Sequence, residues 1–213
     1  MKHLIIIGVG GFAREVYWNA QDSIGYGTEW DLKGFLDGDI RLAEEEYGKL
    51  KLPVLGNINS YEIAEDDVFF CAIGNGQVRK KVVERMLAKD AEFISLIHNT
   101  SIIRGIASYG AGVMFGPRTG VGDHVVIGDF VILNTASAVG HDARIDDYAS
   151  IMSYVDITGY SHIEEGVMFG SGARILPHGR VGAYATVGAG SVVLRKVKPG
   201  TTVFGNPAVP VAK

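Results

Sequence analysis

From Val131 to Gly166 the chain reads VILNTA SAVGHD ARIDDY ASIMSY VDITGY SHIEEG, and the third residue of every group of six is aliphatic. The same period extends in both directions, so that every sixth residue from Ile97 to Val193 is apolar. Helices repeat every 3.6 residues and strands every two, so neither produces this pattern. A six-residue period is typical of a parallel β-helix, in which each unit forms one short strand and a turn.

The first residue of each group is small or β-branched, which fits a tight corner of such a helix. Three units close one triangular coil, so strands that pair with one another are eighteen residues apart in the sequence. With strands roughly 4.8 Å apart, the repeat would stack into a prism about 27 Å tall. We expect left-handed winding, which is usual for hexapeptide repeats although parallel crossovers are normally right-handed.

Composition narrows the class of protein. The 213 residues are 21% charged, with a net charge of −4 and a pI of about 5.9, so no basic footprint for nucleic acid is present. No run approaches the roughly 20 apolar residues of a membrane span, and Leu4 to Ile7 is too short for a signal-peptide core. Cys71 is the only cysteine, which excludes an internal disulfide. We expect a cytoplasmic protein with neither nucleic acid nor a membrane as a partner.

The start of the chain has the pattern strand, glycine turn, helix. The aliphatic run Leu4 to Ile7 stops at GVGGFARE, residues 8–15, after which the pattern becomes helical. Glycines let backbone N–H groups approach an anionic oxygen, and the following helix points its positive end at that oxygen. This pattern favours a mononucleotide-binding unit; a turn that only packs helix on strand is the alternative.

Two further predicted strands end at the same edge. One ends in Gly34 to Asp37, which places a carboxylate where a ribose or a base could donate to it. The other, Val68 to Ile73, leads through Gly74 into a basic helix that begins near Gln77 and carries Arg79, Lys80 and Lys81. Open α/β sheets bind ligands at this carboxyl edge, so we predict a ligand site there.

The motif Gly8-x-Gly10-x-x-Ala13 also fits the dinucleotide fingerprint, so an NAD-dependent dehydrogenase is an alternative. Only about 95 residues precede the repeat, enough for one mononucleotide-binding half and too few for the two halves that hold NAD. We therefore predict an α/β Rossmann-like domain over residues 1–95, a left-handed parallel β-helix over 96–198 and a C-terminal tail over 199–213.

The eighteen-residue register predicts that the histidines of the repeat are too far apart to form a metal cluster. His124 and His178 lie three coils apart on one column, about 14 Å, and cannot share an ion. His141 and His162 fall on different parts of the triangle. Zinc needs imidazole nitrogens at about 2.0–2.1 Å, so no metal is expected within one chain, while a site between subunits stays open.

His141 stands at a predicted coil corner beside Asp142. A carboxylate next to an imidazole makes it more basic, so His141 could serve as a general base. A solvated turn residue is the alternative interpretation.

Taken in order along the chain, these motifs resemble the bacterial nucleotide-sugar acyltransferases of the sialic acid O-acetyltransferase type. This family includes the UDP-4-amino-sugar and GDP-perosamine N-acetyltransferases. The residues that carry the resemblance cover nearly the whole chain: Ile6 to Val16, Gly34 to Asp37, Ala72 to Asn75, Leu96 to His98, Asn134 to Thr135, Gly140 to Asp142 and Gly205 to Ala208.

The resemblance implies that the N-terminal domain holds a nucleotide-linked sugar, that the prism forms a homotrimer, and that acetyl-CoA lies between neighbouring prisms. It implies direct acetyl transfer with His141 as general base, Asp142 as its acidic neighbour and Asn134 lining the same site. Substrate contacts would fall on Gly10, Gly11, Phe12, Asp37, Gly38 and Gly74.

For the cofactor, the resemblance implies that the Gly159 N–H faces the thioester carbonyl and helps hold the oxyanion. Further cofactor contacts would fall on Ser150, Ser171 and Ala189. The chain departs from the family at three places. Ser150 replaces a histidine that touches acetyl-CoA in some members, Phe12 replaces a histidine common in the glycine turn, and Val209 stands where Lys or Arg is usual.

We therefore expect an acetyl-CoA-dependent enzyme that acetylates the amino group of a nucleotide-linked amino sugar for glycan synthesis. A sugar O-acetyltransferase would use the same base and groove. A non-catalytic trimeric protein that binds or senses sugar nucleotides is the alternative from another class. The residues do not identify the sugar, the nucleotide, the acceptor atom or the acyl length.

Overall fold

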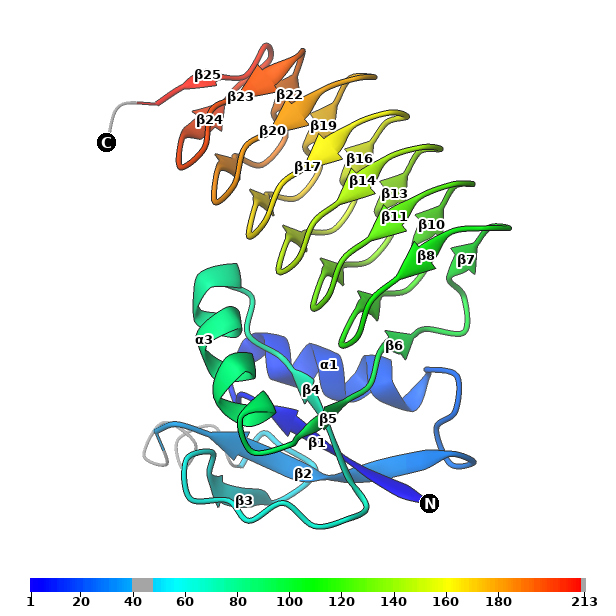
Figure 1. Cartoon of the computed structure of the whole chain (residues 1–213), viewed down its shortest axis with the longest axis vertical. Coiled ribbons are helices and arrows are strands. Elements are labelled where there is room, and N and C mark those ends of the chain that lie inside the picture. Colours follow the sequence, from blue (N-terminus) through cyan, green and yellow to red (C-terminus); the bar gives the residue numbers. More distant parts are fainter. Residues whose placement is uncertain (40–47, 212–213) are drawn as a thin grey trace.

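The computed structural model describes residues 1–39 and 48–211, and its β-prism stands on an N-terminal α/β domain (Figure 1). The N-terminal domain holds a parallel sheet with the strand order β3-β2-β1-β4-β5. Its elements are β1 (Lys2–Ile7), α1 (Gly11–Gln21), β2 (Trp30–Asp37), β3 (Val54–Asn57), β4 (Asp67–Cys71), α3 (Gly76–Leu87) and β5 (Glu92–Phe93).

Alternating residues of the central strand β1 face opposite sides of the sheet. Leu4 and Ile6 pack in one apolar cluster with residues of α1, whereas Ile5 and Ile7 pack in another with residues of α3. All four are at most 2% exposed, which explains why β1 reads as a continuous aliphatic run. The two helices therefore cover opposite faces, and the carboxyl ends of β2, β1 and β4 lie side by side.

The prism has three faces of short, stacked strands. Face 1 consists of β6 (Leu96–Ile97), β9 (Met114–Phe115), β12 (Ile132–Leu133), β15 (Ser150–Ile151), β18 (Met168–Phe169), β21 (Thr186–Val187), β24 (Thr202–Phe204) and β25 (Val209–Pro210). Face 2 consists of β7 (Ile102–Ile103), β10 (Gly120–Val121), β13 (Ala138–Val139), β16 (Asp156–Ile157), β19 (Arg174–Ile175) and β22 (Val192–Val193). Face 3 consists of β8 (Ser108–Tyr109), β11 (Val126–Ile127), β14 (Arg144–Ile145), β17 (His162–Ile163), β20 (Arg180–Val181) and β23 (Lys196–Val197).

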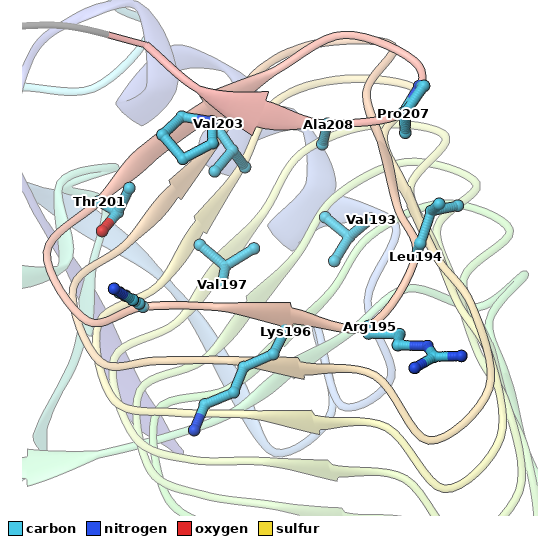
Figure 2. A pocket seen from close by; sticks show the side chains of 11 residues that line it. Val193, Leu194, Arg195, Lys196, Val197, Thr201, Val203, Pro207 and Ala208 are labelled. Carbon is cyan, nitrogen blue, oxygen red and sulfur yellow. The ribbon is translucent and has the colours of Figure 1, made fainter.

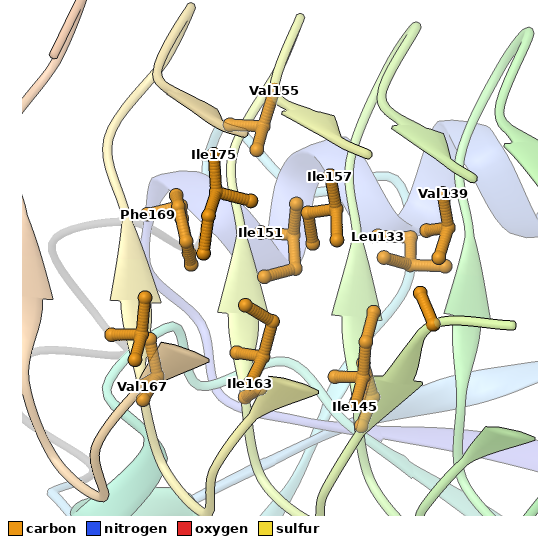
Figure 3. Packing of buried hydrophobic residues seen from close by; sticks show 14 of the residues in the cluster. Leu133, Val139, Ile145, Ile151, Val155, Ile157, Ile163, Val167, Phe169 and Ile175 are labelled. Atoms are coloured by element: carbon orange, nitrogen blue, oxygen red, sulfur yellow. The ribbon is translucent and has the colours of Figure 1, made fainter. Parts of the chain in front are cut away.

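The predicted six-residue period and eighteen-residue register are confirmed. Parallel partners such as Val121 and Val139, or Ile127 and Ile145, differ by eighteen. The periodic aliphatic side chains meet along the axis of the prism (Figure 3). Tyr109 also occupies a periodic position, but it lies near the open first coil and is 42% exposed. Its ring packs on the edge of Phe115.

The N-terminal domain and the prism share a core. Outward-facing Leu96, Met114 and Ile132 of face 1 pack in the same apolar cluster as α1. The N-terminal domain thus covers the first strands of face 1, whereas no described residue of faces 2 and 3 belongs to this cluster.

The six-residue frame ends after Val193, because Val197 of β23 follows it by four residues. In the stretch predicted as a C-terminal tail, β24 pairs in parallel with β21, and β25 turns back against β24. A pocket of about 410 Å³ opens at this end of the prism (Figure 2). Val193, Val197 and Val203 form its floor. None of the predicted site residues lines it.

Candidate active site

His141 lies on the corner where the chain passes from face 2 to face 3, here called the His141 corner. Its Nδ1 lies 2.8 Å from Oδ2 of Asp142. A carboxylate at Nδ1 holds the ring proton there and leaves Nε2 with a free lone pair. The imidazole is 60% exposed, so Nε2 can meet a substrate from outside the prism. The geometry therefore suits a general base.

Gly159 lies one coil beyond His141, as the register predicts. A Cβ at position 159 would stand 2.9 Å from both Nε2 and Cε1 of His141, so a larger residue there would displace the imidazole from this position. The carbonyl of Gly159 accepts from the His178 N–H, whereas its own N–H donates to no acceptor among the described residues. An unused backbone N–H one coil from the imidazole can stabilise a developing oxyanion.

Asn134 lies on a different corner, where face 1 passes into face 2, here called the Asn134 corner. Its side chain is nearly buried, and Oδ1 accepts from the Thr135 N–H at 2.7 Å. Ser171 and Ala189 are exposed on this same corner, one coil apart. Within one chain these predicted residues of the prism thus form two groups. Asn134, Ser171 and Ala189 lie at one edge of face 2, and His141 and Gly159 lie at the other.

The position of Ser150 corrects the prediction that it contacts the cofactor. Its side chain is only 1% exposed, and its hydroxyl donates to the Gly74 carbonyl at 2.7 Å. The hydroxyl also accepts from Nη2 of Arg79 at 2.9 Å. Because this outward-facing position of face 1 is sealed by the N-terminal domain, Ser150 is not open to a ligand.

Arg79, predicted on the basic helix that begins near Gln77, is almost fully buried on the side of α3 that meets the prism. Its guanidinium donates to five backbone carbonyls and to Ser150: those of Ile73, Gly74, Phe130, Tyr148 and Ala149. Burial lowers the pKa of Arg79 to about 10, which leaves it charged at neutral pH. Sequence pattern alone gives no sign of this role, since three of the carbonyls lie 51 to 70 residues away along the chain.

The carboxyl edge of the N-terminal sheet carries a pocket of about 220 Å³. Asp37 and Gly38 line it, as predicted for substrate contacts, together with Gly8. Gly8 has φ +110°, a conformation that favours glycine. Of the other predicted contacts, Gly10 and Gly11 are exposed at the start of α1, Phe12 packs partly into the core, and the Gly74 carbonyl is bound by Arg79 and Ser150.

Arg85 also lines this pocket and was missed by the sequence analysis. Val78, Val82 and Arg85 of α3 share one helical face that points into the pocket. Their spacing of four and three residues was the available signal. With Asp37 and Arg85 both among its lining residues, the pocket has an acceptor and a cation.

Other reactive groups are structurally engaged. Burial raises the pKa of the Cys71 thiol to about 12, which fits a core residue rather than a nucleophile. Among the described residues no cluster of three or more potential ligands could hold a metal ion. In the same part of the chain, no helix has the length and apolar character needed to cross a membrane.

Comparison with known proteins identifies relatives along the whole chain. The family described as the PglD N-terminal domain matches residues 3–86. GDP-perosamine N-acetyltransferase of Escherichia coli O157:H7 is 32% identical over 167 residues, covering 71% of this chain and 75% of that protein.

Solved structures match over nearly their full length. The acetyltransferase domain of PglB from Neisseria gonorrhoeae FA1090, in complex with acetyl coenzyme A, is 30% identical, with a TM-score of 0.84 and 99% of each chain covered. A histidine-to-asparagine mutant of perosamine N-acetyltransferase from Caulobacter crescentus, in complex with CoA and GDP-perosamine, shares the fold. Its TM-score is 0.88 at 23% identity, covering 100% of this chain and 98% of that one.

Proposed function

This chain belongs to the nucleotide-sugar acetyltransferases built on a left-handed hexapeptide β-helix, and on that premise we propose that it acetylates the amino group of a nucleotide-linked amino sugar. It is an acyltransferase, and acetyl-CoA is its acyl donor. The observation that carries the proposal is the exposed imidazole of His141, held by Asp142 and lying against Gly159.

His141 would act as the general base. As the amine lone pair attacks the thioester carbonyl, Nε2 takes the proton that the nitrogen loses. The unused N–H of Gly159 would stabilise the negative charge on the carbonyl oxygen. When the C–S bond breaks, the proton on Nε2 can pass to the sulfur, which regenerates the neutral imidazole. Asp142 keeps the ring in the tautomer that this requires.

A homotrimer would complete the site. Face 2 lies between the Asn134 and His141 corners, and Gly120 and Ala138 give it small outward-facing residues that allow close approach. If three prisms turn face 2 toward a common axis, the Asn134 corner of each meets the His141 corner of the next. Ser171 and Ala189 would then line one wall of an acetyl-CoA groove, and His141 and Gly159 the other.

The N-terminal domain, residues 1–95, would be a Rossmann-like holder of the sugar nucleotide. Asp37 can accept hydrogen bonds from ribose or base, and Arg85 can pair with the diphosphate across the same pocket. The exposed N–H groups at Gly10 and Gly11, at the start of α1, offer a second contact for phosphate.

Thiol release from acetyl-CoA tests the proposal with UDP-, dTDP- and GDP-linked 4-amino sugars beside their 4-hydroxy counterparts. We expect turnover with an amino sugar and a loss of kcat/KM of roughly 10²- to 10⁴-fold in His141→Ala. Asp142→Asn should lose less, because it leaves the base in place. His124→Ala removes an exposed histidine of the neighbouring coil and is the matched control. An effect within threefold for His141→Ala would show that the base is misassigned, and turnover of hydroxy sugars alone would make the enzyme an O-acetyltransferase.

A further inference from the structure

Two aromatic rings continue the His141 corner beyond Gly159. The rings of His141 and Tyr160 are 5.1 Å apart and perpendicular, with an interplanar angle of 90°. On its other side Tyr160 stacks on His178, with ring centroids 4.8 Å apart and an interplanar angle of 4°. The three rings form a continuous series along the corner.

The backbone sets the positions of these rings. The Tyr160 N–H donates to the His141 carbonyl at 3.0 Å, and the His178 N–H donates to the Gly159 carbonyl at 3.1 Å. Tyr160 and His178 have φ values of 58° and 60°, in the left-handed region that favours glycine over bulky residues. Tyr160 follows Gly159, which lies one coil beyond His141, so the Tyr160 ring meets the His141 ring; His178 occupies the position equivalent to Tyr160 in the next coil and stacks on it.

Burial does not explain Tyr160. Its side chain is 51% exposed, so an aromatic residue in a disfavoured backbone conformation gains little from the core here. At the corner between faces 3 and 1 the comparable stack of Phe130 on Tyr148 is buried and belongs to the core shared with α3. The stacked pair of Tyr160 and His178 does not belong to that core.

We propose that Tyr160 is a positioning residue that holds the His141 imidazole in its reactive orientation, with His178 stacked behind it. The Asp142 contact fixes one ring nitrogen but leaves the ring free to swing about it, and Gly159 only leaves space beneath the ring. The perpendicular Tyr160 ring supplies the side support that these two lack. This inference rests on the proposed role of His141 as base.

The experiment compares Tyr160→Ala, Tyr160→Phe and His178→Ala with His124→Ala, the exposed histidine of the neighbouring coil. We expect Tyr160→Ala to lower kcat roughly 3- to 10-fold, with both KM values within twofold. Tyr160→Phe keeps the ring and should retain kcat within twofold. His178→Ala should lower kcat by about twofold, since it only loosens Tyr160.

The decisive measurement repeats Tyr160→Ala in the His141→Ala background. A residue that acts through His141 has nothing left to position there, so the double variant should be no slower than His141→Ala. A further loss in the double variant, or Tyr160→Phe as slow as Tyr160→Ala, would overturn the inference. If His141→Ala itself stays active, the proposed base is wrong; if only Tyr160→Ala stays active, the positioning role alone fails.

Discussion

Gly159→Ala would place a methyl carbon 2.9 Å from two ring atoms of His141. Because the imidazole is exposed, it can rotate away rather than strain the prism, so we expect stability to survive and the base to be displaced. The predicted result is a fall in kcat of at least about tenfold with the melting temperature within a few degrees. Gly48→Ala is the control, since a Cβ there meets no atom of the described residues within 4 Å. Unchanged kcat in Gly159→Ala would contradict the close approach.

Arg79 offers a prediction about stability. Arg79→Met would leave several buried carbonyls without a donor, at about 1–3 kcal/mol for each group left unsatisfied. We expect a loss of at least about 3 kcal/mol in urea unfolding. Arg79→Lys should recover little of it, because an ammonium donates only three hydrogen bonds and lacks the planar fork. Lys81→Met, exposed on the same helix, should stay within about 0.5 kcal/mol.

At the residue scale, the contact between His141 and Asp142 could be predicted from the sequence, because the two residues are adjacent in the chain. The local sequence pattern did not distinguish exposed polar residues from buried ones. Ser150 and Arg79 are both polar, yet they bond to each other in the junction between the two domains. That junction joins segments about 70 residues apart, which no local period reports.

Among the elements, the prism was predictable because each coil repeats one physical requirement, an apolar residue toward the axis every six positions. The order of β1, α1 and β2 also followed from local patterns. The corners were less predictable. Tyr148, Tyr160 and Tyr184 adopt positive φ, where glycine or asparagine would be expected, and their ring contacts depend on residues a coil away.

Helix α3 is tied to the prism by a second contact that depends on pH. Lys80 Nζ lies 2.6 Å from Oε1 of Glu165, which also accepts from the Tyr184 hydroxyl. The hydrogen bond from Lys80, followed by that from Tyr184, holds the pKa of Glu165 below its usual 4.5. A carboxyl whose pKa is lowered by folding stabilises the fold above its unfolded pKa and stops doing so as pH falls through the lowered value.

Glu165→Gln should therefore lower the melting temperature at pH 7, and the difference from the unmodified chain should shrink once the pH falls below 4.5. We expect no more than about 1 kcal/mol, because the pair is partly exposed and screened by water. Thermal scans between pH 7 and pH 3 measure it, with exposed Glu62→Gln as the control. A difference that stays constant over this range would show that the Glu165 charge does not stabilise the junction.

At the scale of the whole molecule, the N-terminal domain and the predicted site residues of the prism occupy different parts of the prism surface. The N-terminal domain covers the first strands of face 1, whereas the predicted site residues of the prism other than Ser150 border face 2. Asn134, Ser171 and Ala189 lie at one edge of face 2, and His141 and Gly159 lie at the other. If these residues form the site as proposed, a single chain presents two half-sites at different corners, and the proposed trimer would join each half to its complement.

Mixed trimers test this division. Ala189→Trp should fill the groove at the Asn134 corner, and His141→Ala removes the base at the other corner, so each variant alone should be inactive. Co-expressed with two different affinity tags and purified through both, each mixed trimer should recover activity at one of its three sites, about one site in three, where two intact corners meet. His141→Ala mixed with Gly159→Ala is the matched control, because every His141 corner in that mixture is damaged and activity should not rise above that of Gly159→Ala alone. Recovery in neither mixture, with trimers present by light scattering, would place both half-sites of each active site on one chain.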